Sequence, residues 1–291
     1  MTNIIGCHGS VWSGTFDALA FRKAVERTIA AGFDLIEVPL FDPYSFDATR
    51  ARQVIEEVGI AVNASLGLTG STDISSEHRE TVAAGEALLN KAIEVLGVIG
   101  GRYLVGVIYG ALNKHRAPAS EDGRQNGLSV LRRVAARAED AGIKLGLEVV
   151  NRYETNIINT AKEAMAYVEE ADHTNVYVHL DTYHMNIEEP DMFSPVLRAA
   201  TRLGYVHIGE SHRGYLGSGS VDFDAFFRAL ALTSYDGPIV FESFSSAVVD
   251  PAMSNLLAVW RNLWDDPCHL ASHANQFIRN KLCAVDTIRS H

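Results

Sequence analysis

The sequence predicts an α/β protein: a (β/α)8 TIM barrel with an extra helix at its C-terminal end. Two observations predict this fold. Short apolar runs rich in Val, Ile and Leu alternate with longer segments of helical periodicity along the chain of 291 residues. The runs are apolar at nearly every position, as expected of parallel strands that helices cover on both faces. Eight strand–helix repeats in succession favour closure of the sheet into a barrel.

The predicted elements follow one another without a linker or a low-complexity tract, so we expect one barrel domain over residues 1–291. Strands are expected at residues 4–8, 35–40, 61–68, 103–109, 145–150, 176–181, 205–209 and 238–242. Helical spacing is clearest at residues 16–31, 76–96, 127–141 and 160–171. Glycine is a common helix stop signal before the next strand, here at Gly32, Gly59, Gly142 and Gly204.

The amphipathic stretch at residues 269–281 predicts the extra helix, which would pack on the barrel or on a partner subunit. An open doubly wound sheet is the structural alternative. It usually has fewer strands, and the first predicted strand here is not followed by the GxGxxG turn of dinucleotide-binding sheets. The closed barrel is therefore the favoured architecture.

Composition and charge exclude several classes of protein. The net charge is −11 and no stripe of Lys and Arg is present, which disfavours a nucleic-acid partner. No apolar run approaches the roughly 20 residues that a membrane span needs. Cys7, Cys268 and Cys283 lack close pairing, which argues against a disulfide framework or a thiolate zinc site. With no signal-peptide pattern at the N-terminus, we expect a cytoplasmic protein.

Four successive predicted strands end in residues that commonly bind metals. In a barrel the active site lies at the C-terminal ends of the strands, so these residues would meet at one mouth. Burying a carboxylate among Val, Leu and Ile is costly unless a cation or hydrogen bonds compensate its charge. No comparable set of Lys or Arg stands at strand ends to pair with them. We therefore predict one metal site made by Glu148, Asp181, His207 and Glu242.

Three carboxylates and one imidazole form an oxygen-rich ligand set that suits Mn²⁺, Mg²⁺ or Co²⁺. These ions prefer more than four ligands, so positions remain for two substrate oxygens. A vicinal hydroxyketone would fill both. The ion would then act as a Lewis acid that favours removal of the proton beside the carbonyl.

The sequence around these residues closely resembles the ketose 3-epimerases, the group that contains D-tagatose, D-allulose (psicose) and L-ribulose 3-epimerases. The resemblance covers nearly the whole chain, whereas the broader xylose isomerase-like barrel superfamily shares only the sparser ligand pattern. The runs that carry it are LEVVNRYE at 147–154, HLDTYHMNIEE at 179–189, VHIGESHRG at 206–214 and IVFESF at 239–244.

By this resemblance, the four predicted ligands hold one divalent cation per subunit, with Mn²⁺ favoured over Co²⁺ and Mg²⁺. Glu148 and Glu242 also match the acid/base pair on opposite faces of the substrate C3. One removes the C3 proton and the other returns a proton to the opposite face of a cis-enediolate. Two groups are needed, because a single base that returned its own proton would regenerate the starting sugar. The resemblance further implies a homodimer or homotetramer that acts on a free ketose.

The resemblance also implies the residues that contact the sugar. His184 and Arg213 match residues that bind the oxygens at C1–C3, and Glu154 matches a further polar contact. Trp12 and Tyr109, at the ends of the first and fourth strands, are candidates for an apolar wall against the sugar. For these two residues, packing in the core is the alternative.

Two departures from the family pattern bear on substrate choice. His8 stands where the D-tagatose and D-allulose enzymes usually carry an aromatic residue. Residues 110–113 read Gly-Ala-Leu-Asn where the hexulose epimerases usually have Trp-Pro. Both changes alter the wall at the distal end of the sugar, so we include His8 among the substrate contacts and expect a preference for a ketopentose such as L-ribulose.

Three other functions are compatible with parts of the pattern. An aldose–ketose isomerase would use the same metal site but would move hydrogen between C1 and C2. A phosphodiesterase of the apurinic-endonuclease type shares the barrel but needs several metals, more strand-end histidines and a basic face. A sugar-binding protein without activity would not need two opposed carboxylates on a metal.

Overall fold

The computed structural model describes residues 3–289 of the chain and confirms the predicted barrel. Eight parallel strands form a closed sheet in sequence order, and β1 pairs with β8 to complete the ring. The strands are β1 (Ile5–His8), β2 (Leu35–Pro39), β3 (Ala61–Ser65), β4 (Tyr103–Gly106), β5 (Lys144–Val149), β6 (Val176–Asp181), β7 (Leu203–Ile208) and β8 (Ile239–Phe241).

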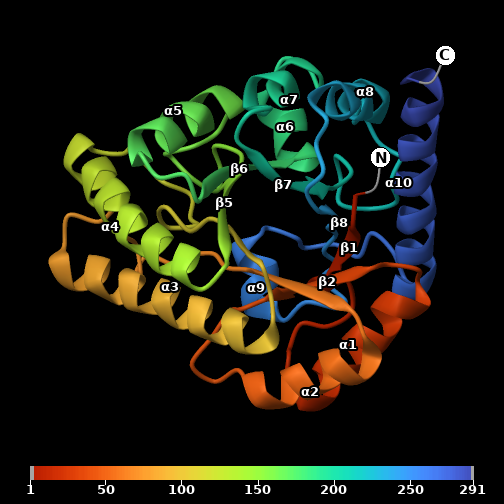
Figure 1. The fold of residues 1–291 in the computed structure, drawn as a ribbon, viewed down its shortest axis with the longest axis horizontal. Helices are drawn as coiled ribbons and strands as arrows, with labels where there is room; N and C mark the ends of the chain where they lie inside the picture. The colour runs from red at the N-terminus through yellow and green to blue at the C-terminus, as the bar shows by residue number, and fades with distance from the viewer. Residues whose placement is uncertain (1–2, 290–291) are drawn as a thin grey trace.

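Helices surround the strands on all sides (Figure 1). They are α1 (Ala18–Ala30), α2 (Ala48–Val58), α3 (Arg79–Ile99), α4 (Glu121–Asp140), α5 (Ala161–Ala171), α6 (Thr182–Glu188), α7 (Ser194–Ala199), α8 (Phe223–Thr233), α9 (Pro251–Leu256) and α10 (Pro267–Arg289), with a short 3-10 turn η1 (Gly9–Val11) after β1. The predicted extra helix is confirmed as α10, which packs beside α8 and is longer than expected. Among the described residues, no helix is both long and apolar enough to cross a membrane.

β3 and β4 are each three residues shorter than their apolar runs predict, and in β4 the backbone turns at Gly106. This residue ends β4 with φ of 110°, a conformation that L side chains rarely adopt. A Cβ at this position would lie 2.4 Å from the carbonyl oxygen of Leu66, so only glycine fits there. Residues 107–109 therefore continue as a loop instead of a strand, and β3 also ends early, at Ser65.

The glycine stop signals are correct at three of the four positions. Gly59 caps α2 in the left-handed conformation, and Gly32 and Gly142 follow α1 and α4 with positive φ. Gly204 does not stop a helix, because it lies inside β7. A Cβ there would come within 2.5 Å of the Cβ of Tyr177, so this glycine serves close packing between β6 and β7.

Candidate active site

The four predicted metal ligands meet at the C-terminal mouth of the barrel. Glu148 lies near the end of β5, Asp181 ends β6, His207 lies near the end of β7, and Glu242 follows β8 directly. One ligand atom from each lies within 4.8 Å of the others, and all four side chains are buried. The register of adjacent strands produces this cluster, because Asp181 is paired with His207 across β6 and β7.

His207 presents a free ring nitrogen to this cluster. Its Nδ1 lies 3.5 Å from a carboxylate oxygen of Glu148 and 3.4 Å from one of Glu242. Among the described residues this Nδ1 has no hydrogen-bond partner, although it is fully buried. Burial lowers the pKa of His207, but the carboxylates of Glu37 and Glu242 outweigh burial and raise it well above its usual value. An unpaired imidazole nitrogen among carboxylates fits a divalent cation.

Burial and neighbouring charges shift the pKa values of all three carboxyls. Burial raises the pKa of Glu148 to about 8, and the neighbouring His207 opposes this rise only in part. Burial also raises the pKa of Asp181, against the effect of Arg213. For Glu242, burial acts upward, but Arg213 and His207 outweigh it and bring the pKa down to about 2. Burial therefore penalises the ionised forms of Glu148 and Asp181, a penalty that a bound cation would reverse.

Arg213 is held at the cluster by an unusual backbone and a chain of hydrogen bonds. Its guanidinium donates to Glu242 Oε2 at 2.5 Å and to Asp181 Oδ2 at 3.1 Å. Its φ is 61°, in the left-handed region that few non-glycine residues adopt. The Ser243 hydroxyl donates to the Arg213 carbonyl oxygen, and Trp264 Nε1 donates to Ser243 Oγ at 2.8 Å. This relay holds the Arg213 backbone where the side chain reaches the carboxylates.

A cavity of about 360 Å³ opens onto this cluster. His8, Glu148, Glu154, His184, Arg213 and Glu242 all line it, together with apolar side chains that include Leu112, Phe244, Met253 and Leu257. Residues of α9 and its flanks form one wall of the cavity. Apart from Asp181 and His207, the sequence predicted eight site residues. Six of them line this cavity, and Trp12 and Tyr109 do not.

Polar neighbours fix His184 and His8 within the cavity wall. The backbone N–H of Asn151 donates to His184 Nδ1 at 3.1 Å, and the Asn151 side chain donates to Glu154 at 2.8 Å. Burial lowers the pKa of His184 well below its usual value, which favours the neutral ring, and its Nε2 lies 3.3 Å from Nη2 of Arg213. His8 Nε2 lies 3.1 Å from Ser65 Oγ.

Trp12 and Tyr109 lie outside this cavity. The ring of Tyr109 is fully buried against Tyr167 of α5, with 6.0 Å between the ring centroids. Its hydroxyl donates to the backbone carbonyl of Glu148 at 2.8 Å. Trp12 is also buried in the hydrophobic core. Of the two alternatives stated for these residues, their positions match core packing, because both side chains are buried among core residues and neither lines the cavity.

Sequence reasoning missed several buried polar residues that organise the site. Glu37 on β2 lies 2.9 Å from His207 Nε2 and is fully buried. Glu210 accepts hydrogen bonds from the backbone N–H groups of Ser211 and Gly217, at 2.8 Å each, and so shapes the loop after β7. A Glu inside the apolar run at 35–40 was a usable signal for Glu37. Nothing local in the sequence marks Glu210 as a loop anchor.

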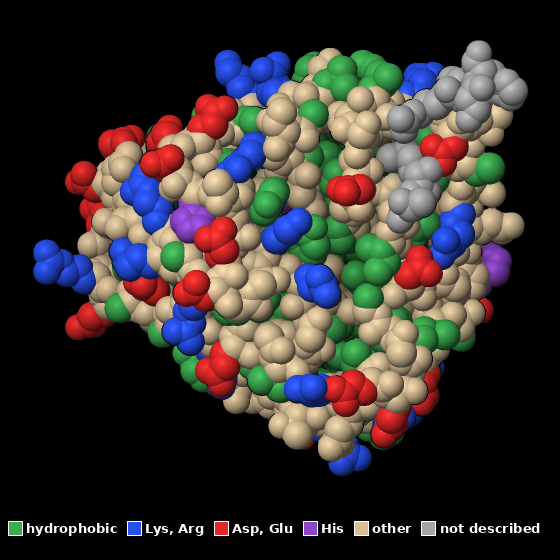
Figure 2. Space-filling model, in the orientation of Figure 1, with side chains coloured by type: hydrophobic (Ala, Val, Ile, Leu, Met, Phe, Trp, Pro, Cys, Tyr) green, Lys and Arg blue, Asp and Glu red, His purple; other side chains and the backbone are tan. Residues whose placement is uncertain are grey.

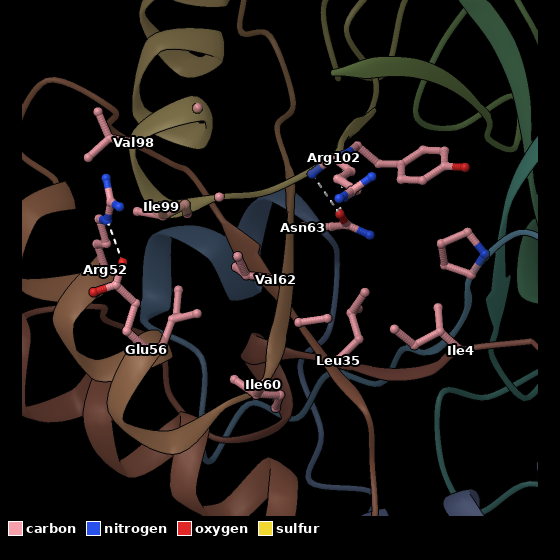
Figure 3. A pocket seen from close by; sticks show the side chains of 16 residues that line it. Ile4, Leu35, Arg52, Glu56, Ile60, Val62, Asn63, Val98, Ile99 and Arg102 are labelled. Atoms are coloured by element: carbon pink, nitrogen blue, oxygen red, sulfur yellow. Dashed lines mark hydrogen bonds and ion pairs between the residues drawn. The ribbon is translucent and has the colours of Figure 1, made fainter. Parts of the chain in front are cut away.

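A second hollow, of about 440 Å³, lies at the opposite end of the barrel (Figure 3). Most of its lining is apolar. Its charged members include the exposed pair Arg52–Glu56, with 2.7 Å between Nε and Oε1. The Arg102 backbone N–H donates to Asn63 Oδ1 at 3.2 Å.

On the face shown in Figure 2, acidic and basic side chains are interspersed, and no basic stripe crosses it.

Comparison with known proteins identifies the family of the chain. The family model described as xylose isomerase-like TIM barrel matches residues 25–263. The chain is 58% identical over 287 residues to a ketose 3-epimerase of Arthrobacter globiformis, with 99% of both chains covered. It is 51% identical over 276 residues to an L-ribulose 3-epimerase of Methylomonas sp. (strain DH-1), with 95% of this chain and 96% of the relative covered.

Solved structures agree with these matches. A D-allulose 3-epimerase from Methylomonas sp. in complex with D-allulose superposes with a TM-score of 0.95 at 51% identity, covering 96% of this chain and 97% of that chain. A structure of L-ribulose 3-epimerase superposes with a TM-score of 0.96 at 40% identity, covering 99% of this chain and 97% of that chain. The similarity therefore includes both ends of the barrel and nearly every element described above.

Proposed function

The chain belongs to the ketose 3-epimerases of the xylose isomerase-like TIM barrel family, and from this premise we propose that it inverts C3 of a free ketose with one divalent cation. It is a carbohydrate isomerase. The observation that carries the finer proposal is the pair of buried carboxylates, Glu148 and Glu242, on one cavity. A reaction that removes a proton from one face and returns it to the other needs such a pair.

The positions of the two glutamates support their separate roles. Glu148 comes from β5 and Glu242 follows β8, so they approach the cavity from strands three places apart around the barrel. A planar enediolate held between them would have one carboxyl on each side. One glutamate takes the C3 proton and the other delivers a proton to the opposite face.

The other polar side chains of the cavity would bind and orient the sugar. His184 lies beside Arg213, and Arg213 presents a guanidinium that is already held beside Glu242. Glu154, positioned by Asn151, accepts from a sugar hydroxyl. When bound, the cation supplies a Lewis acid that lowers the pKa of the C–H bond beside the carbonyl. Glu148, Asp181, Glu242 and Nδ1 of His207 would hold it, and we favour Mn²⁺.

For the substrate we propose a ketopentose such as L-ribulose. One relative is named L-ribulose 3-epimerase, and a solved relative holds D-allulose, so both sugar sizes are used by similar proteins. His8 and Leu112 line the cavity in this chain, at the two departures from the hexulose pattern. We propose that these two side chains select for the shorter sugar.

Deuterium incorporation tests the reaction directly. Purified protein with added Mn²⁺ is incubated in D₂O with L-ribulose and, separately, with D-allulose, and NMR locates the deuterium. Epimerisation places deuterium at C3 and produces the C3 epimer. Deuterium at C1 or C2 together with an aldose product would instead identify an aldose–ketose isomerase and overturn the proposal.

A further inference from the structure

The two ring nitrogens of His207 lie in different surroundings. Nδ1 faces the carboxylates of Glu148 and Glu242 at 3.5 and 3.4 Å, in the proposed metal site. Nε2 points the other way and lies 2.9 Å from Oε2 of Glu37. The ring is also held from its side by His179, whose centroid lies 4.1 Å away at an interplanar angle of 86°.

Glu37 is a buried carboxylate that lacks an ordinary cationic partner. Its side chain is fully buried on β2, between neighbours as apolar as Ile36 and Val38. The ion pairs recorded for it among the described residues are both with histidines, His207 at 2.9 Å and His8 at 3.5 Å. Burying a carboxylate costs several kcal/mol unless hydrogen bonds or charges compensate it. An apolar residue would fill this place at lower cost if packing were its only role.

The chemistry of the contact fixes the state of the histidine. An ionised carboxylate can only accept hydrogen bonds, so Nε2 of His207 carries a proton. In the neutral ring the lone pair is then on Nδ1, which is the atom aimed at Glu148 and Glu242. A histidine binds a metal through such a lone pair, and a carboxylate on its far nitrogen makes it a better ligand.

We propose that Glu37 is a positioning residue of the metal site: it holds the Nε2–H form of His207 and thereby tightens cation binding without touching the cation. The inference rests on the proposed metal site. Weakening the contact between Glu37 and His207 should lower the metal affinity 10- to 100-fold, as is typical when a hydrogen-bond partner of a metal ligand is changed.

Direct titration of Mn²⁺ tests the proposal without any activity assay. Electron paramagnetic resonance measures free Mn²⁺ in metal-stripped wild type, Glu37→Gln and the matched control Glu86→Gln. Glu86 loses the same charge, but it pairs with Arg133 on the outer helices α3 and α4. We expect Glu37→Gln to raise the Mn²⁺ dissociation constant at least tenfold, with Glu86→Gln within twofold of wild type.

The other outcomes distinguish failure of the role proposed for Glu37 from failure of the proposed metal site. Equal affinity of wild type and Glu37→Gln overturns the positioning role, as does an equal loss in Glu37→Gln and Glu86→Gln. Failure of the wild type to bind Mn²⁺ overturns the metal site itself.

A second measurement needs no variant and therefore does not depend on Glu37→Gln folding. In Mg²⁺-loaded wild type labelled with ¹⁵N-histidine, long-range ¹H–¹⁵N spectra report which ring nitrogen of His207 is protonated. We expect the proton on Nε2 and none on Nδ1. A proton on Nδ1 overturns the proposal.

Discussion

The two ends of the barrel each have a hollow of similar size but of opposite chemistry. The C-terminal mouth encloses about 360 Å³ and places buried Glu148, Glu242 and Arg213 on its wall. The N-terminal end encloses about 440 Å³, and its ion pair, Arg52–Glu56, is exposed to solvent. The volumes of these two hollows do not tell them apart. Buried ionisable side chains gathered on one cavity mark the functional end.

The largest expected effect is a loss of kcat when a glutamate at the C-terminal mouth is replaced by glutamine. The same replacement at the N-terminal end should have little effect. Glu148→Gln or Glu242→Gln removes a proton carrier, so we expect kcat to fall by about 10²–10⁴-fold. Glu56→Gln makes the same change at the other end and is expected to leave kcat within twofold of wild type. Initial rates with L-ribulose and saturating Mn²⁺ measure both. Near-normal turnover by either mouth variant would contradict the proposed acid/base pair.

Metal removal should change stability as well as rate. Three buried carboxylates lie together at the mouth, and Arg213 pairs with two of them, Asp181 and Glu242, so a bound divalent ion stabilises the folded state. At a Mn²⁺ concentration of 100 times the Kd, we expect a gain of about 2.7 kcal/mol in the free energy of unfolding. Thermal unfolding with EDTA, and after Mn²⁺ is restored, measures this gain. An unchanged Tm would show that the mouth binds no cation.

A change in the cavity wall should alter substrate choice more than overall activity. Leu112→Ala enlarges the cavity, and we expect the ratio of kcat/KM for D-allulose to that for L-ribulose to rise by roughly 10-fold. The matched change at the other end, Ile60→Ala, should leave this ratio unchanged. A ratio that Leu112→Ala does not move would mean that this wall does not select the sugar.

The smallest effect concerns the relay behind Arg213. Trp264→Phe keeps the aromatic ring but removes the N–H that donates to Ser243. A lost hydrogen bond of about 1 kcal/mol predicts a roughly fivefold lower kcat/KM. Tyr103→Phe removes a hydroxyl at the opposite end of the barrel and serves as the control. Equal kcat/KM values for Trp264→Phe and wild type would show that this relay does not contribute to activity.

The sequence allowed the barrel, the extra helix and the family to be predicted, and all three are confirmed. The ligand positions were visible because strand ends in a barrel converge whatever the loops do. Side-chain direction in loops was not visible, since it depends on turns such as the one at Gly106. For the same reason the positions of Tyr109 and of α9 could not be foreseen. The metal, the oligomeric state and the cellular location stay predictions.

The pairing of β1 with β8 has a consequence for how the chain folds. Glu242 follows the last strand, and that strand is fixed by a partner at the start of the chain, with Ile5 opposite Ile239. Arg279 of α10 also bonds to Asp34, 3.0 Å away. Contacts of such long sequence separation form late and slowly. During synthesis, the four-ligand set cannot assemble until the last strand has emerged, so cation binding reports that the ring has closed.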